Sequence, residues 1–252
     1  MTQLGRFREA FAGFEEFYTV IGGTACQIVA SSRGGEFRAT QDLDLVVIVD
    51  ADGFERFGEA FWGFVRDGGY EASRGSRGEM RFYRFGHPQQ DGFPKEIELF
   101  SRITLEEPLD VGQRIVPVPL SGGLSSLSAI LLDDDYYNLL KEGRQSIDGI
   151  SVLAPEWLIL FKMKARIDLV RRSREAGDVD SRDLKKHLRD VFRLWEYVDP
   201  EARVAVPFPI EADIKEFFDT SDITSQQLKQ IGIDEPVELI VEDLKRIYDL
   251  TR

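Results

Sequence analysis

Cysteine is almost absent from this sequence, which contains Cys26 alone among 252 residues. A single cysteine excludes an internal disulfide, and it excludes a zinc site built from cysteine ligands. We expect Cys26 to be a small buried residue of a helix rather than a nucleophile.

Long apolar segments are missing as well. No stretch reaches the roughly 18 apolar residues that a spanning helix requires, so the sequence predicts no membrane segment. Residues 1–11 lack the apolar core and the cleavage site of a signal peptide. Together with the single cysteine, these absences predict a cytoplasmic protein without a membrane partner.

Basic residues are outnumbered: 32 Lys and Arg face 45 Asp and Glu, which gives a formal net charge of −13. Proteins that follow a nucleic-acid backbone usually present a basic surface, because contacts with phosphates supply most of their non-specific affinity. Here basic residues cluster locally, at Arg74–Arg84 and Lys162–Arg174. The charge balance therefore disfavours a large nucleic-acid footprint and favours a small molecule or a compact RNA end.

The composition that remains is that of a globular protein, with 42% hydrophobic and 31% charged residues and 18 Phe. Its length is ample for a sizeable core. Strand and helix patterns alternate in the first half of the chain, and helical patterns dominate the second. We predict an α/β domain over residues 1–120 and a mostly helical region over 121–252, with the Gly/Ser-rich stretch Ser121–Ser128 as the boundary.

The most informative stretch begins with a short apolar segment, Tyr18–Ile21, which predicts a buried strand. Gly22 and Gly23 follow as a turn, and Thr24 is a candidate cap for the next helix. A glycine turn at the start of a helix offers unpaired backbone amides, which suit an anion such as a triphosphate.

A second strand in this stretch begins with two acids, Asp42 and Asp44. Side chains alternate along a strand, so both acids point to one side while Leu43 and Leu45 point into the core. Two carboxylates on one side need a counter-charge, and a divalent cation such as Mg²⁺ supplies one. An anion cradle beside a cation clamp predicts metal-assisted nucleotidyl transfer.

The segment Gly22–Ala25, followed by Arg38–Asp44, resembles the signature of the nucleotidyltransferase fold. More narrowly, it resembles the AbiEii-type branch found in bacterial abortive-infection and type IV toxin–antitoxin systems. The resemblance covers about the first 190 residues. It implies a small mixed sheet flanked by helices, two or three metal-binding acids, and an NTP as nucleotidyl donor.

Two further strands are predicted at Glu79–Phe85 and Lys95–Phe100, joined by a Gly/Pro-containing loop. The family implied by the resemblance adds a third carboxylate from a neighbouring strand. Glu98 is our choice for this ligand and Glu96 the alternative, although an aspartate is commoner at that position. An equally open interpretation is that these glutamates lie on the solvated face of an edge strand and bind nothing.

Pro155 predicts the start of a long helix that places Lys162 and Arg166 on one face. We expect Lys162, as a catalytic group, and Lys164, as a nucleotide-binding group, to neutralise phosphate charge. The alternative is that these lysines extend into solvent.

The next predicted helix, Ser181–Val198, carries a polar stripe of Asp183, His187 and Asp190. The Lys162–Ala165 segment and the Arg182–Asp183 pair resemble the second half of the AbiEii-type pattern, which favours a role for Asp183 in orienting Lys162 or deprotonating an acceptor. His187 is either a base or a solvated surface residue.

The remaining expectations concern structure. They are an amphipathic helix over 2–17, a helix over 52–66, an edge strand over 114–119, a helix capped by the acids 133–135, a strand over 150–153, and helices beyond Pro200 of which 237–250 is the clearest.

The sequence thus predicts a nucleotidyltransferase that uses Mg²⁺ or Mn²⁺, with Asp42, Asp44 and Glu98 as metal ligands and Gly22, Gly23 and Thr24 at the phosphates. The NMP would pass to a tRNA or another cellular acceptor, and an antitoxin protein is a possible partner. Two alternatives stay open: a non-catalytic nucleotide-binding module that regulates a partner, and a transferase that modifies a small molecule such as an antibiotic.

Overall fold

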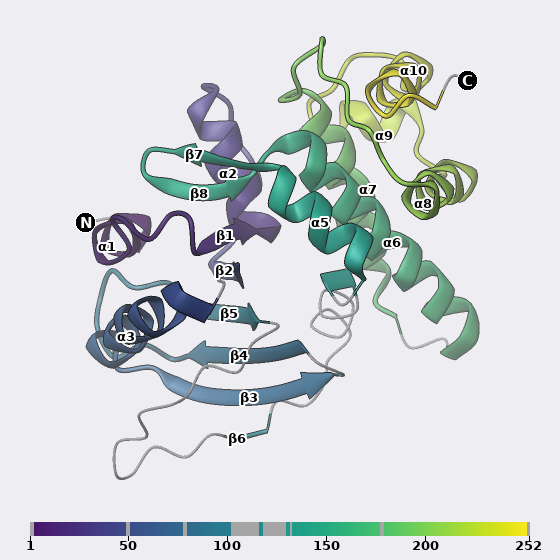
Figure 1. Cartoon of the computed structure of the whole chain (residues 1–252). Helices are drawn as coiled ribbons and strands as arrows, with labels where there is room; N and C mark the ends of the chain where they lie inside the picture. Colours follow the sequence, from purple (N-terminus) through teal and green to yellow (C-terminus); the bar gives the residue numbers. More distant parts are fainter. Residues whose placement is uncertain are drawn as a thin grey trace. The chain divides into compact units, whose positions relative to one another are not determined.

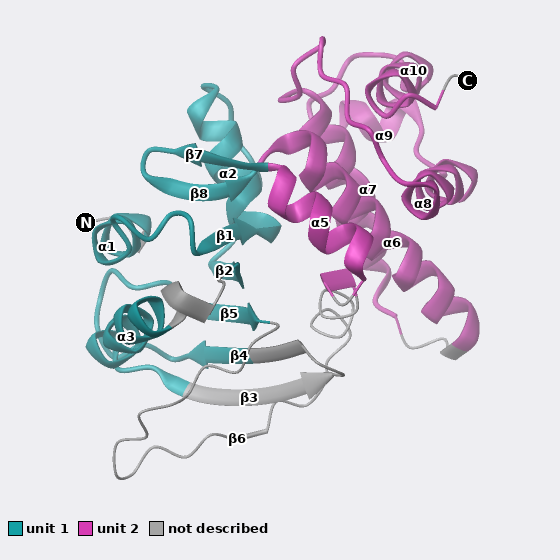
Figure 2. Cartoon of the chain, in the orientation of Figure 1, with its two compact units in different colours: residues 1–121, 144–153 teal, residues 122–143, 154–252 magenta. Residues whose placement is uncertain are grey.

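The computed structural model of the chain is shown in Figures 1 and 2. It describes residues 3–48, 51–77, 80–101, 116–117, 130–131, 133–176 and 179–250. The chain divides into two compact units: residues 1–121 with 144–153, and residues 122–143 with 154–252 (Figure 2). The sequence predicted a single division at residue 120, but residues 144–153 also belong to the first unit.

The first unit is built on a mixed sheet of eight strands in the order β6-β3-β4-β5-β2-β1-β8-β7. The strands are β1 (Tyr18–Ile21), β2 (Asp42–Val47), β3 (Glu71–Arg77), β4 (Met80–Gly86), β5 (Glu96–Ser101), β6 (Val116–Pro117), β7 (Arg144–Ile147) and β8 (Ile150–Leu153). β2 lies parallel to β5 and antiparallel to β1, and β1 lies parallel to β8. The predicted mixed α/β class is confirmed, and the proline-containing β6 lies at the sheet edge as expected.

Three helices accompany the sheet: α1 (Gln3–Ala10), α2 (Gly22–Ser32) and α3 (Ala51–Gly68). Aromatic rings from α1 and α3 pack on the apolar side chains of the sheet. The ring of Phe7 lies 5.4 Å from that of Tyr18, and the ring of Phe61 lies 5.3 Å from that of Phe85. α2 contacts β1, β2 and the β7–β8 hairpin. The aromatic core therefore occupies one face of the central strands and leaves their polar side chains on the other.

The second unit contains six helices within the described residues (Figure 1). They are α5 (Asp134–Glu142), α6 (Pro155–Ala176), α7 (Ser181–Trp195), α8 (Phe208–Asp219), α9 (Ser225–Lys229) and α10 (Val237–Ile247). α6 is central and contacts α5, α7 and α8. Across the described part of the chain, no helix is both long enough and apolar enough to cross a bilayer.

Several predicted elements have different bounds. The first helix ends at Ala10 instead of extending to residue 17, and Gly13 beyond it takes a left-handed φ of 84°. β3 and β7 were not predicted, because their sequences EASRGSR and RQSI lack apolar alternation. The predicted boundary at 121–128 lies outside the described residues.

Other structural predictions are confirmed. Asp133 caps α5, accepting hydrogen bonds from the backbone N–H groups of Asp135 and Tyr136. Pro155 is the first residue of α6. Cys26 is buried, and its thiol donates to the carbonyl of Gly22. Each of these features depends on local sequence alone.

Candidate functional site

Four carboxylates lie side by side where β2 and β5 begin. In the parallel register of these strands, Asp42 is opposite Glu96, and Asp44 is opposite Glu98. The alternate residues of both strands, such as Leu43 and Ile97, are buried. The four acids therefore share the face of the sheet away from the aromatic core, and we call Asp42, Asp44, Glu96 and Glu98 the acid ladder.

The partly buried position of the acid ladder disfavours the ionised forms of its carboxylates. Burial raises the pKa of the Glu98 carboxyl to about 7, and the neighbouring charge of Asp44 adds to the rise while Arg84 opposes it. Burial also raises the pKa of Glu96, against the influence of Arg84. Both shifts mean that the anionic forms are costly here, and that an added cation would stabilise them.

Arg84 supplies a cation from the neighbouring strand β4. It lies opposite Glu98 in the antiparallel β4–β5 register. Its Nε donates to Oε1 of Glu98 over 3.1 Å, its Nη2 contacts the same oxygen, and Nε is 3.3 Å from Oε1 of Glu96. The sequence analysis counted Arg84 only as the end of a basic cluster. The signal it missed was strand alternation, which places Arg84 on the polar side between the buried Tyr83 and Phe85.

The glycine turn lies directly against the acid ladder. Ile21, the last residue of β1, is opposite Asp44, and α2 begins at the next residue, Gly22. Gly22 has a left-handed φ of 69°, and a Cβ on it would fall 1.8 Å from Oδ2 of Asp44. Only glycine fits this close approach, which brings the first turn of α2 onto the carboxylate.

Thr24 does not cap the helix as predicted. The N-cap residue is Ile21, and no side chain provides a capping hydrogen bond there. The helix starts three residues earlier, at Gly22 with its left-handed φ, so Thr24 lies within its first turn. Its hydroxyl instead donates to the backbone carbonyl of Asp42 over 2.6 Å, which ties the start of α2 to the start of β2.

Gly23 lies within the same first turn, against Thr40. A Cβ at Gly23 would lie 3.1 Å from the Cβ of the Thr40 side chain. The space beside the two glycines is thus filled by the side chains of Asp44 and Thr40, and the glycines let the first turn of α2 pack closely against these residues.

Two pockets adjoin the acid ladder. One of about 520 Å³ is lined by residues that include Gln41, Asp42, His87, Asp91, Lys95 and Glu96. The other, of about 290 Å³, is lined in part by Thr24, Thr40 and Asp42. Asp42 borders both, so a molecule in either pocket would meet the ladder at this residue.

The ladder offers the oxygen donors that Mg²⁺ and Mn²⁺ prefer. In the part of the chain that the structure describes, no group of three or more His, Cys, Asp or Glu is arranged to hold a metal ion. Arg84 occupies an oxygen of Glu98. The donor chemistry thus fits a hard divalent cation, while Arg84 holds one oxygen of Glu98 in this structure.

In the second unit, Lys162 is buried and pairs with a carboxylate other than the predicted one. Its Nζ is 3.1 Å from Oδ2 of Asp190, whose side chain is fully buried and also lies 3.8 Å from Arg193. Asp183, to which the sequence analysis assigned the orienting role, is exposed in the first turn of α7. The predicted polar stripe on α7 therefore runs from solvent at Asp183 into the core at Asp190, with His187 between them.

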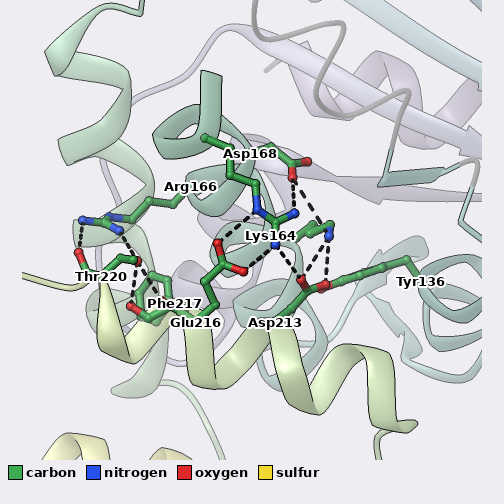
Figure 3. A network of polar contacts seen from close by, with 9 residues as sticks. Tyr136, Lys164, Arg166, Asp168, Asp213, Glu216, Phe217 and Thr220 are labelled. Carbon is green, nitrogen blue, oxygen red and sulfur yellow. Dashed lines mark hydrogen bonds and ion pairs between the residues drawn. The ribbon is translucent and has the colours of Figure 1, made fainter. Parts of the chain in front are cut away.

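Lys164 is engaged in a separate cluster that joins α5, α6 and α8 (Figure 3). Its Nζ donates to both carboxylate oxygens of Asp213, at 3.1 and 2.9 Å, and Tyr136 donates its hydroxyl to the same carboxylate. Arg171 binds Glu216 in bidentate fashion and lies 3.9 Å from Asp213. We call Tyr136, Lys164, Arg171, Asp213 and Glu216 the α8 clamp.

The long helix also reaches α8 at its C-terminal end. Arg166 is buried, and its Nη2 donates to the carbonyl of Thr220 over 2.9 Å. Lys162 faces Asp190 and Lys164 faces Asp213, and both side chains are mostly buried, so the alternative interpretation that these lysines extend into solvent is wrong. The sequence analysis did not single out Asp213 or Glu216, since neither lies in a recognisable motif.

Comparison of the chain with protein-family models, with curated proteins and with solved structures gave no match. The resemblance to AbiEii-type nucleotidyltransferases thus rests on the residues that carry it.

Proposed function

We propose that the first unit is a nucleotidyltransferase that depends on Mg²⁺ or Mn²⁺ and has the nucleotidyltransferase fold. The observation that carries the proposal is the register of β1, β2 and β5. It gathers the acid ladder against a helix start whose first residue, Gly22, admits no side chain. Nucleotidyl transfer requires a cation site next to a phosphate-binding site, and the acid ladder and the first turn of α2 would supply the two.

The roles follow from the positions of the residues. Asp42, Asp44 and Glu98 would hold the cation, which when bound neutralises charge on the phosphates. Gly22 and Gly23 would admit the triphosphate to the backbone amides of the first turn of α2. An acceptor hydroxyl would attack the α-phosphorus of the NTP, the α–β bridging bond would break, and pyrophosphate would leave with that bonding pair.

Thr24 has a supporting place in this scheme. The hydroxyl of Thr24 donates a hydrogen bond to the carbonyl of Asp42. This bond fixes the start of α2, which would bind phosphate, next to the acids that would bind metal. Lys162 and Lys164 are not part of the proposal, since their ammonium groups face Asp190 and Asp213.

The acceptor that fits best is a small molecule. The larger pocket beside the ladder is lined by Asp42, Asp91 and Glu96 against Lys95 and His87, and the whole chain carries a net charge of −13. Both features disfavour the long, negatively charged sugar–phosphate backbone of tRNA. They favour a neutral or cationic acceptor that carries a hydroxyl group. A role as a toxin held in check by an antitoxin protein is a cellular hypothesis that rests on the resemblance alone.

A second candidate is a nucleotide-binding module without turnover. The ion pair of Arg84 with Glu98 favours it, because an acid that stays bound to arginine leaves the metal with fewer ligands. The two candidates differ in whether pyrophosphate is released.

The test is pyrophosphate release from each of the four NTPs with Mg²⁺ or Mn²⁺, in the presence of separate small-molecule and RNA acceptor pools. Wild-type protein is compared with the double variant Asp42→Ala/Asp44→Ala. Release that disappears in the variant supports the transferase. Binding of NTP that depends on metal and on these acids, without release, selects the regulatory module. Equal behaviour of both proteins contradicts a site at the acid ladder.

A further inference from the structure

Arg84 contacts two of the four carboxylates of the acid ladder, Glu96 and Glu98. Two of its nitrogens, Nε and Nη2, reach the same oxygen of Glu98, and Nε also lies 3.3 Å from Glu96. The side chain of Glu98 is 13% exposed and that of Arg84 28% exposed, so the pair is shielded from solvent on most sides. A shielded guanidinium–carboxylate pair is stronger than a surface pair.

The surrounding charges explain why an arginine is needed there. Glu98 feels the charge of Asp44 as well as that of Arg84, and Arg84 is in turn influenced by Glu96 and Asp42. The guanidinium therefore interacts with Glu98, Glu96 and Asp42. Without it, the start of β2 and β5 would bring like charges together across the ladder.

We propose that Arg84 is a positioning residue that competes with the divalent cation for Glu98. This inference rests on the proposed function. Before metal binds, the guanidinium holds Glu98 in place and balances part of the ladder's charge. A metal ion held through Oε1 of Glu98 would have to displace the guanidinium, because that oxygen already accepts from Nε and Nη2 of Arg84.

The exchange has two opposite consequences for a protein that lacks Arg84. The metal-free protein loses a counter-charge and should be less stable. The metal-bound protein no longer has to displace a guanidinium, so its affinity for the cation should rise. A residue with a merely structural role would lower stability without raising metal affinity.

The experiment is calorimetric titration of Mn²⁺, without nucleotide, into the wild type, Arg84→Gln and Arg84→Lys. We expect Arg84→Gln to bind Mn²⁺ about tenfold more tightly than the wild type, since a unit positive charge next to a ligand has been removed. Arg84→Lys retains the charge but loses the forked geometry, and it should fall between the two.

The matched control is Arg144→Gln. It removes the same charge from the first unit at β7, where Arg144 donates to the carbonyl of Glu16, four positions along the sheet from β5. Its Mn²⁺ affinity should equal that of the wild type. Thermal unfolding with and without Mn²⁺ should show a lower melting temperature for metal-free Arg84→Gln and a larger upward shift on adding metal.

Asp44→Asn separates the two claims. If Asp44→Asn abolishes Mn²⁺ binding but Arg84→Gln binds no more tightly than the wild type, the competition is overturned while the metal site stands. If Asp44→Asn binds Mn²⁺ as the wild type does, or if neither the wild type nor Arg84→Gln binds it, the metal site itself is contradicted, and the competition falls with it.

Discussion

Clustered acids differ in the two units in how many cations contact them. In the α8 clamp, Asp213 accepts two hydrogen bonds from Lys164 and one from Tyr136, while Arg171 binds Glu216 beside it. In the acid ladder, Asp44 and Glu98 lie opposite each other, and the pKa of Glu98 is raised by burial and by Asp44. Beside the clamp, Asp168 also lies 4.0 Å from Lys164 and from Arg171, so two cations serve three acids there, whereas Arg84 brings one positive charge to the four acids of the ladder.

The difference indicates what each cluster is for. A cluster whose acids on α8 lie within 4.0 Å of Lys164 or Arg171, residues of the neighbouring helix α6, holds helices together. A cluster with excess negative charge costs stability, and such a cost is typical of a binding site. The predictions below test this contrast between a structural and a functional cluster.

The largest expected effect is a separation of activity from stability. Asp44→Asn should lower nucleotidyl transfer by about 10²-fold or more, because a direct contact with the cation is lost. Its stability should not fall, since a repelling charge next to Glu98 has been removed. Asp213→Asn should behave in the opposite way, with a lower unfolding free energy and unchanged turnover. Pyrophosphate release and urea unfolding of both variants check this, and equal losses of activity would break the contrast.

The second effect concerns the buried pair in the second unit. Asp190→Ala removes the carboxylate that faces Lys162, and it should cost about 3–5 kcal/mol of unfolding free energy because a buried ammonium loses its counter-charge. The double variant Asp190→Ala/Lys162→Met should recover much of the loss. Urea denaturation measures both, and a cost for Asp190→Ala below about 1 kcal/mol would contradict a structural role for the pair.

The third effect isolates the close approach at the glycine turn. Gly22→Ala adds left-handed strain and a clash with Asp44, and it should cost about 3 kcal/mol with loss of Mn²⁺ binding. Gly34 has a similar φ of 74° but open space around it, so Gly34→Ala is the matched control and carries strain alone. Chemical unfolding and metal titration compare the two, and equal costs would show that Asp44 is not in contact.

The fourth effect is a dependence on pH. The folded-state pKa of Glu98 is raised from its ordinary 4.5 to about 7, so the protonated carboxyl is favoured by folding. Its contribution to stability is fully present below about pH 4.5 and is lost as the pH rises through about 7. The unfolding free energy of the wild type should therefore fall by about 3 kcal/mol over this window relative to Glu98→Gln. Parallel profiles of the two proteins would contradict the raised pKa.

The smallest effect is expected at Asp183. Its side chain is exposed at the start of α7, so Asp183→Asn should change stability by less than about 0.5 kcal/mol and leave Mn²⁺ affinity as it is. A large loss of turnover in this variant would restore the role that the sequence analysis gave to Asp183.

Local sequence was enough to predict part of the candidate site. Strand alternation put Asp42 and Asp44 on one face, whereas the choice of Glu98 on a neighbouring strand came from the family resemblance. The structure adds that β2 and β5 are adjacent and in register, so that Asp44 meets Glu98. The shared face of Asp42 and Asp44 was predictable because the period of a strand depends only on the strand itself.

What the sequence could not predict depends on contacts between distant segments. Arg84 reaches Glu98 only through the β4–β5 register, and Lys162 reaches Asp190 only through the packing of α6 on α7. Thr24 was expected to cap α2 from its residue type, but the left-handed Gly22 moved the start of the helix. Pairings of this kind are decided by tertiary structure, for which residue type is a weak guide.

The central claim is that the acid ladder takes a divalent cation together with a nucleotide. Its most direct test is electron paramagnetic resonance of Mn²⁺ titrated into the protein with a non-hydrolysable NTP analogue, for the wild type and Asp42→Asn/Asp44→Asn. If the acid ladder binds both, the wild type should remove more of the free Mn²⁺ signal than the analogue alone removes, and the variant should not. Equal loss of the free signal with both proteins would contradict it.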